Sequence, residues 1–222
     1  MEKRRKIVAF AVALMIVVSV MASFQRMHMQ SHALPIRVAC VGDSITENSG
    51  YPSDLQSLLG SNYSVGNFGV SGSTVSLNSW KPYMNQSKFQ DAEDFEPNIV
   101  VIMLGTNDDL RSLHQYNESF EDDYNRLISS FQQVESNPRV MIATSPPIFS
   151  NSSDLSPTYL ANTIIPKTED VASNLNLPVI DVYSAIGNQT DCFIDGVHPN
   201  SQGATVIASE VYDAISAQYP NP

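Results

Sequence analysis

The sequence predicts an α/β domain built on a parallel β-sheet, and two observations support this fold class. Short apolar runs recur between residues 36 and 183, and several are apolar at nearly every position, as in parallel strands covered on both faces. Segments with apolar residues at helical spacing lie between these runs. Strands that alternate with helices form βαβ units with right-handed crossovers, so we expect one domain within residues 34–222.

The spacing of apolar residues predicts the individual strands and helices. The apolar runs predict five strands, at residues 36–42, 63–69, 98–105, 139–145 and 178–183. Apolar residues at positions i, i+4, i+7, i+8 and i+11 predict a helix over residues 120–134, and a similar stripe predicts one over 204–215. Residues 51–60 and 159–175 predict shorter or less regular helices. We find no internal repeat and no linker in this part of the chain.

Residues 1–33 have a different character. Four basic residues occupy positions 3–6, and residues 7–24 are apolar apart from two serines. This pattern predicts either a signal peptide, cleaved after Ala22 or Ala33, or a single-pass signal anchor at residues 7–24 with a cytoplasmic N-terminus. Both alternatives place the following domain in the secretory pathway, either secreted or attached as a type II membrane protein that faces the lumen or the exterior.

The charge and residue composition of the chain indicate which kinds of partner it can bind. The chain of 222 residues contains 12 Lys and Arg against 23 Asp and Glu, a net charge of −11, which makes nucleic acid a poor partner. Five N-x-[ST] sequons favour a lumenal glycoprotein, and they start at Asn62, Asn85, Asn117, Asn151 and Asn188. An oxidising compartment allows Cys40 and Cys192 to pair, but Cys40 has the setting of a buried strand residue, and we expect free thiols.

Polar segments follow each predicted strand. They read GDSIT (42–46), GVSGST (69–74), GTNDD (105–109), SPP (145–147) and, after the last strand and its loop, DGVHPN (195–200). Because open parallel sheets bind ligands beyond the carboxyl ends of their strands, we expect these segments to form one site.

The residue types in these segments are those that acyl transfer requires. Ser44 supplies a hydroxyl, and His198 supplies a base near neutral pH, with Asp195 one turn earlier to orient the ring. Gly72 offers an unobstructed backbone N–H, and Asn107 offers an uncharged amide donor. Each residue taken alone also fits an ordinary role in a turn, but all of them lie at strand ends or in the final loop. His114, the other histidine of the domain, lies in a polar segment, and we expect it in solvent.

The motifs GDSIT, NFGVSGST, GTND and DGVHPN resemble, in order and spacing, the four signature blocks of the SGNH/GDSL hydrolases. The resemblance covers residues 36–217, and the absence of G-x-S-x-G argues against the common α/β-hydrolase elbow. It implies a flavodoxin-like three-layer α/β/α sandwich with a five-stranded parallel sheet. It also implies Ser44 as nucleophile, His198 as base and Asp195 as its orienting partner, with an oxyanion hole formed by Ser44, Gly72 and Asn107.

This resemblance implies a serine esterase that works through an acyl-enzyme, without metal or other cofactor. We expect the acidic runs at 108–109 and 121–123 to be solvated faces or caps, and Asp43 and Asp108 to hold their loops by hydrogen bonds to the backbone. The sequence alone does not define the oligomeric state.

The substrate is less defined by sequence. The motifs look most like those of small carbohydrate O-acetylesterases, but lysophospholipase-like and thioesterase-like enzymes share them. Between Ser73 and Asp94, aromatic residues mix with amides, which suits sugar binding by Trp80 and Tyr83; the alternative is that these rings cover the sheet. A non-catalytic, membrane-tethered recognition module of the same fold is the alternative from another class, and the complete set of signature residues argues against it.

Overall fold

The computed structural model describes residues 15, 21, 34–149 and 154–218. Residues 1–34 and 35–222 form separate units, and the second contains every element discussed below. The predicted signal segment at residues 1–33 and the sequon at Asn151 lie outside the described residues, apart from two isolated positions. In the part of the chain that is described, no helix combines the length and the hydrophobicity needed to cross a membrane.

The centre of the domain is a five-stranded sheet with all neighbours parallel. Its strands are β1 (Ile36–Gly42), β2 (Tyr63–Gly69), β3 (Ile99–Met103), β4 (Arg139–Ala143) and β5 (Val179–Ile180), in the order β2-β1-β3-β4-β5. This is the flavodoxin-like order, and it confirms the predicted fold. The chain leaves β1 toward one edge of the sheet and crosses back to β3, so β1 and β3 flank the point where ligands bind in such sheets.

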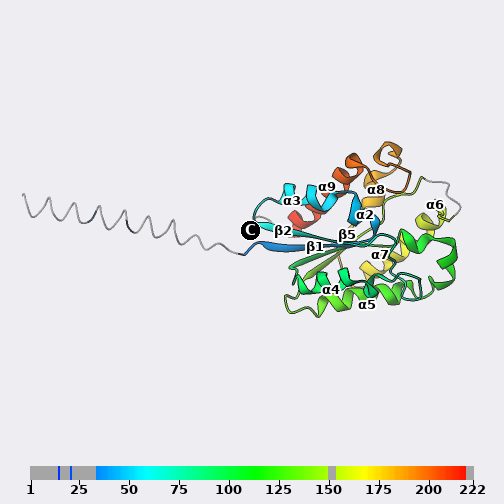
Figure 1. The fold of residues 1–222 in the computed structure, drawn as a ribbon, viewed down its shortest axis with the longest axis horizontal. Helices are drawn as coiled ribbons and strands as arrows, with labels where there is room; N and C mark the ends of the chain where they lie inside the picture. The colour runs from blue at the N-terminus through cyan, green and yellow to red at the C-terminus, as the bar shows by residue number, and fades with distance from the viewer. Residues whose placement is uncertain (1–14, 16–20, 22–33, 150–153, 219–222) are drawn as a thin grey trace, which may run out of the picture. The chain divides into compact units, whose positions relative to one another are not determined.

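Helices cover both faces of the sheet (Figure 1). One face carries α2 (Ser44–Asn48), α3 (Tyr51–Leu59), α8 (Val182–Ile186) and α9 (Ser201–Gln218). The other carries α4 (Ser87–Asp94), α5 (Phe120–Gln132) and α7 (Ile165–Asn174), with the short α6 (Pro157–Tyr159) and a π-helical turn (Leu160–Ile164) leading into α7. Short 3₁₀ turns occupy Tyr83–Asn85, Asn107–Asp109, Arg111–Tyr116 and Thr190–Cys192.

The two longest helices form where the sequence predicts them because each buries one apolar stripe. In α5 the buried apolar side chains are Phe120, Tyr124, Leu127, Ile128 and Phe131. In α9 they are Ala204, Ile207, Ala208, Val211 and Ile215. Each large side chain of this kind contributes roughly 1.5–3 kcal/mol relative to its exposed state, so packing against the sheet stabilises both helices.

Two elements differ from the prediction. The last strand, expected over residues 178–183, comprises only Val179 and Ile180, because the Asp181 side chain accepts a hydrogen bond from the Ser184 N–H (3.0 Å) and caps α8. Residues 73–94 contain a crossover helix, α4, that the sequence did not indicate. Its only fully buried side chain is Ala92, so it lacks the apolar stripe by which helices are found.

Both cysteines are free thiols. Cys40 in β1 and Cys192 before α9 are buried in the core on the α9 face of the sheet. Burial raises the pKa of Cys40 to about 12, so its thiol stays protonated and serves as a small apolar side chain.

Candidate active site

Ser44 begins α2 directly after β1. Asp43 caps this short helix, and its Oδ1 accepts a hydrogen bond from the Ile45 N–H (2.9 Å). Gly42 lets α2 and β3 pack closely against the end of β1, because a Cβ at this position would lie 2.8 Å from the Thr46 Cβ and 2.7 Å from the Met103 carbonyl oxygen. The turn leaves the Ser44 side chain half-buried at the carboxyl end of the sheet.

His198 and Asp195 meet Ser44 from the loop before α9. His198 Nε2 lies 3.1 Å from Ser44 Oγ, and His198 Nδ1 lies 2.8 Å from Asp195 Oδ2. The other carboxylate oxygen, Oδ1, accepts the backbone N–H groups of Val197 (2.9 Å) and His198 (2.8 Å). Gly196 has a φ of +81°, which lets the chain turn this sharply. One carboxylate therefore fixes both the turn and the imidazole ring.

The charge of Asp195 follows from these contacts. Partial desolvation disfavours its ionised form, but the hydrogen bonds from the His198 backbone, the His198 ring and the Val197 N–H outweigh that effect and lower the pKa of Asp195 to about 2. The carboxylate is therefore ionised at neutral pH.

Asn107 contacts Asp43, which precedes Ser44, and also Ser73, which follows Gly72. Asn107 follows β3, and its Nδ2 donates to Asp43 Oδ2 (3.2 Å) and to the Ser73 carbonyl oxygen (3.0 Å). Gly72 has a φ of +75°, and a Cβ placed on it would lie 3.0 Å from Cη2 of Trp80. A side chain at position 72 would be both strained and crowded. The structure thus brings together all five residues that the sequence places in this site.

Buried carboxylates hold the segments near Asn107 and Gly72. Asp108 is fully buried, and its two oxygens accept the N–H groups of Val75 and Ser76, each at 2.9 Å. The prediction that Asp43 and Asp108 hold their loops through the backbone is confirmed. The acidic run at residues 108–109 was predicted to be a solvated face or a cap. It is not a solvated face, because Asp109 is buried as well and accepts the Ser156 N–H (2.6 Å).

Burial also changes the acidity of these groups. Desolvation, with a contribution from the nearby Asp108, raises the pKa of Asp43 to about 7, although the hydrogen bond from Ile45 acts in the opposite direction. Burial likewise raises the pKa of Asp108. Within residues 34–149 and 154–218, no group of three or more His, Cys, Asp or Glu side chains is arranged to hold a metal ion.

The two aromatic residues expected to bind substrate have different environments. Trp80 is 66% exposed, and its ring lies beside Gly72. Tyr83 is fully buried; its hydroxyl donates to the Phe68 carbonyl oxygen (2.7 Å), and its ring packs edge-on against Phe89. The prediction that Tyr83 contacts substrate is therefore wrong, and Tyr83 is a core residue.

A second histidine also differs from expectation. His114 is half-buried rather than solvated: its ring stacks on Tyr159 with 3.5 Å between centroids, and its Nε2 lies 2.8 Å from the Asp109 carbonyl oxygen. These contacts give His114 a structural role away from Ser44.

A hollow of about 320 Å³ opens beside Ser44, on the side of His198. Ile45, Ile194 and Pro199 contribute apolar surface, whereas Asn48 and Ser49 contribute polar groups. The volume is at the lower end of the range for small-molecule sites, which is roughly 300–1,000 Å³. This hollow offers room for a small ligand next to the Ser44 hydroxyl.

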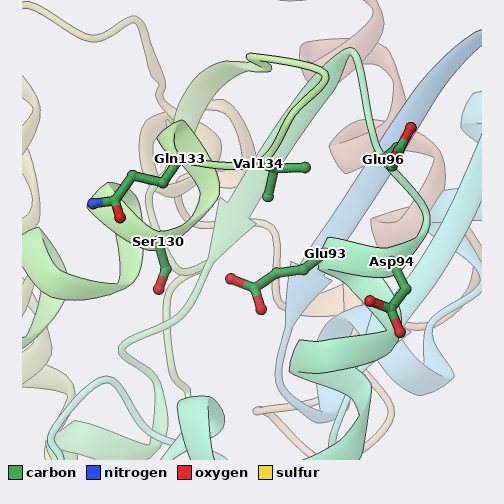
Figure 2. A pocket seen from close by; sticks show the side chains of 6 residues that line it. All are labelled: Glu93, Asp94, Glu96, Ser130, Gln133 and Val134. Carbon is green, nitrogen blue, oxygen red and sulfur yellow. The ribbon is translucent and has the colours of Figure 1, made fainter.

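Another hollow, of about 510 Å³, lies between the ends of α4 and α5 (Figure 2). Glu96 precedes β3, so this hollow is at the amino end of the strands, away from Ser44. Its lining contains no nucleophile with a neighbouring base and consists of Glu93, Asp94, Glu96, Ser130, Gln133 and Val134. Ser44, Asp195 and His198 line the first hollow instead.

The chain belongs to the GDSL-like lipase/acylhydrolase family, whose sequence model matches residues 40–206. It is 34% identical over 206 residues to an acetylxylan esterase from Xylanibacter ruminicola, a match that covers 81% of this chain and 43% of that protein. The chain spans about half the length of the curated relatives it matches.

Solved structures agree on the fold. A carbohydrate acetylesterase family member from Sinorhizobium meliloti superposes with a TM-score of 0.66 at 20% identity, over 83% of this chain and 99% of its own. An acetyl xylan esterase superposes with a TM-score of 0.65 at 21% identity, over 81% of this chain and its entire length. The fold of this chain is therefore shared with these solved structures.

Two further residues of the site were not predicted. Glu47 and Lys81 contact the loop that carries Gly72, but both are charged residues in polar segments, and nothing in their sequence spacing distinguishes them from surface residues.

Proposed function

We propose that this protein is a serine esterase in which Ser44 is the nucleophile, His198 the general base and Asp195 its orienting partner. The observation that carries the proposal is the continuous set of contacts from Ser44 Oγ through the His198 ring to Asp195, at 3.1 and 2.8 Å, beside the hollow. These distances are within the reach that proton transfer requires.

The reaction follows from this geometry. As Ser44 Oγ attacks the ester carbonyl, its proton moves to His198 Nε2, while the ionised Asp195 keeps the proton on Nδ1 and stabilises the imidazolium. His198 then gives the proton to the departing alcohol oxygen. Water attacks the acyl-enzyme with the same base, and the carboxylic acid is released as the Ser44 hydroxyl reforms.

Three donors can receive the negative charge on the carbonyl oxygen: the N–H groups of Ser44 and Gly72 and the Asn107 amide. Among the described residues, no protein acceptor takes a hydrogen bond from the two N–H groups. The Asn107 amide donates to Asp43 at 3.2 Å and to Ser73 at 3.0 Å, and these contacts fix its orientation. Loss of one such donor costs roughly 10²–10³ in kcat.

We propose an O-acetyl group on a carbohydrate as the substrate. The departing oxygen must lie within reach of His198 Nε2, so the hollow on that side receives the alcohol. Its exposed apolar residue Ile194 suits the face of a sugar ring, and Asn48 and Ser49 suit its hydroxyls. On the other side, the ring of Trp80 against Gly72 limits the space for the acyl group. The similarity to an acetylxylan esterase supports the same assignment.

We further propose that the domain acts in the secretory pathway, as a secreted or type II membrane-anchored glycoprotein. The sequence pattern of residues 1–33 supports this location. The exposed sequons at Asn62, Asn85 and Asn188 are suited to glycans. Asn117 is buried, and its Nδ2 donates to the Asp108 carbonyl oxygen and the Tyr159 hydroxyl, so this sequon has no room for one. N-terminal sequencing of the expressed protein distinguishes cleavage from anchoring.

The test is turnover of p-nitrophenyl esters from acetyl to decanoyl. We expect the acetyl ester to be the best substrate and Ser44→Ala to lose activity. Ser57→Ala, an exposed serine in α3, should keep it and is the matched control.

Equal activity of the wild type and Ser44→Ala would refute Ser44 as nucleophile, and an inactive wild type would favour a non-catalytic recognition module. An optimum at eight carbons or longer would favour the lysophospholipase or thioesterase alternative. Release of acetate from acetylated xylan then tests the carbohydrate assignment.

A further inference from the structure

Two oppositely charged side chains hold Ser71, the residue before Gly72. Lys81 Nζ donates to the Ser71 carbonyl oxygen at 2.8 Å. Glu47 Oε2 accepts the Ser71 N–H at 2.7 Å and also the Ser71 hydroxyl. Glu47 belongs to α2, and Lys81 lies ten residues further along the chain. Ser71 is thus fixed at its N–H, its side chain and its carbonyl.

The contact with Lys81 involves the peptide group that contains the Gly72 N–H. The Ser71 carbonyl and the Gly72 N–H belong to one planar unit and point in opposite directions. An ammonium on the carbonyl oxygen therefore fixes the direction of the N–H. It also draws electron density toward the oxygen, which makes the N–H a stronger donor, as expected for linked hydrogen bonds.

Lys81 is itself held in place. Its carbonyl oxygen accepts the Thr74 N–H at 3.1 Å and the Thr74 hydroxyl at 3.3 Å, so the loop from Ser71 to Lys81 closes on itself. Hydrogen bonds from Ser71, together with the charge of Lys81, lower the pKa of Glu47 against a smaller effect of desolvation, so its carboxylate is ionised at neutral pH. Asn48 Nδ2 adds a bond to Ser71 Oγ at 2.9 Å.

We propose that Lys81, assisted by Glu47, is a positioning residue of the oxyanion hole, which orients and polarises the Gly72 N–H for the transition state. The inference rests on the proposed function, because it requires Gly72 to be an oxyanion donor. Lys81 does not touch the substrate in this scheme and acts only through the peptide. Its effect should therefore appear where the negative charge develops, and substrate binding in the ground state should change little.

The experiment compares Lys81→Met with the wild type on p-nitrophenyl acetate. We expect kcat to fall about tenfold with KM nearly unchanged, less than the roughly 10²-fold loss for a complete oxyanion donor. Lys81→Arg, which retains a charged donor, should recover most of the rate. Lys88→Met is the matched control: this lysine lies in α4 beside Asp91 and should leave kcat unaltered.

A second readout separates positioning from a purely structural role. Methylboronic acid forms a tetrahedral adduct when Ser44 Oγ becomes the fourth ligand of boron and the Ser44 proton moves to His198 Nε2. The inhibition constant of methylboronic acid should rise in Lys81→Met by about the factor that kcat falls. Thermal unfolding is recorded for each variant, and Lys81→Gln repeats the comparison with a polar side chain.

The inference would be overturned if kcat of Lys81→Met is unchanged in an active enzyme, or if only KM rises. It would also be overturned if the rates of the variants follow their unfolding midpoints rather than the charge at position 81. An inactive wild type would instead contradict the proposed function itself, so the two failures are distinguishable.

Discussion

The two sides of Ser44 are supported in different ways. On the base side, the side chains of His198 and Asp195 are 43% and 53% exposed, and the turn is held largely by Asp195 itself, with one longer-range bond from the Phe149 N–H to the Gly196 carbonyl (2.7 Å). On the oxyanion side, the carboxylates of Asp43 and Asp108 are buried, and Asn107 and Asp108 connect segments that lie far apart in sequence.

This difference agrees with the work proposed for each side. Donors that receive a developing charge act best when they are fixed before the reaction, and buried hydrogen bonds over long sequence distances provide that rigidity. A base must exchange its proton with the departing alcohol and with water, which requires access to the hollow. We therefore expect changes on the base side to affect activity alone, and changes on the oxyanion side to affect activity and stability together.

The largest expected effect is that of Asp195→Asn. The amide still accepts the two backbone N–H groups, but its other end presents a donor to His198 Nδ1 and favours the wrong tautomer, so kcat should fall about 10⁴-fold. Because both side chains are well exposed, the midpoint of thermal unfolding should hardly move.

Steady-state kinetics and a thermal scan of the same preparation check both parts. Asp191→Asn, in the preceding 3₁₀ turn, is the matched control and should match the wild type. A large loss of stability in Asp195→Asn would show that the turn around Asp195 contributes to the stability of the whole domain.

The next effect is that of Asn107→Ala. This change removes one oxyanion donor, with a loss of roughly 10²–10³ in kcat. It also leaves Asp43 Oδ2 and the Ser73 carbonyl without this donor, so the free energy of unfolding should fall by about 1–3 kcal/mol.

Chemical denaturation gives the stability, and Asn188→Ala, at an exposed position, is the control. A rise in KM with unchanged kcat would exclude Asn107 from the oxyanion hole, and unchanged stability would remove the contrast between the two sides.

The smallest effect concerns the pH dependence of stability. The pKa of Asp43 is about 7 in the folded protein, against an ordinary value of 3.8, so between these values the folded state binds more protons than the unfolded state. Stability is then lost as pH rises, by up to about 1.4 kcal/mol per pH unit. Asparagine at position 43 does not titrate, so Asp43→Asn does not show this loss of stability. The free energy of unfolding of the variant minus that of the wild type should therefore increase from pH 5 to pH 7, by less than about 3 kcal/mol.

Denaturation curves at several pH values measure this difference, and Asp191→Asn should run parallel to the wild type. Parallel curves for Asp43→Asn would mean that Asp43 titrates near its ordinary value despite its burial.

Much of the site was predictable because strand ends of a parallel sheet converge. The positions of Ser44, Asn107 and His198 follow from the apolar runs before them and from the motif order. Tyr83 was misassigned because composition cannot tell whether a ring in a polar segment turns inward, and here its hydroxyl finds a partner in the Phe68 carbonyl. Lys81 was missed because its role depends on one backbone contact across a loop.

The buried sequon has a consequence for the order of events during synthesis. Asn117 becomes enclosed only when Ser76, Asp108 and Tyr159 gather around it. In a host that glycosylates secreted chains, an oligosaccharide attached earlier would keep Asn117 from its native contacts with Asp108 and Tyr159. The yield of correctly folded protein would then depend on whether the domain folds before the oligosaccharide is transferred to Asn117.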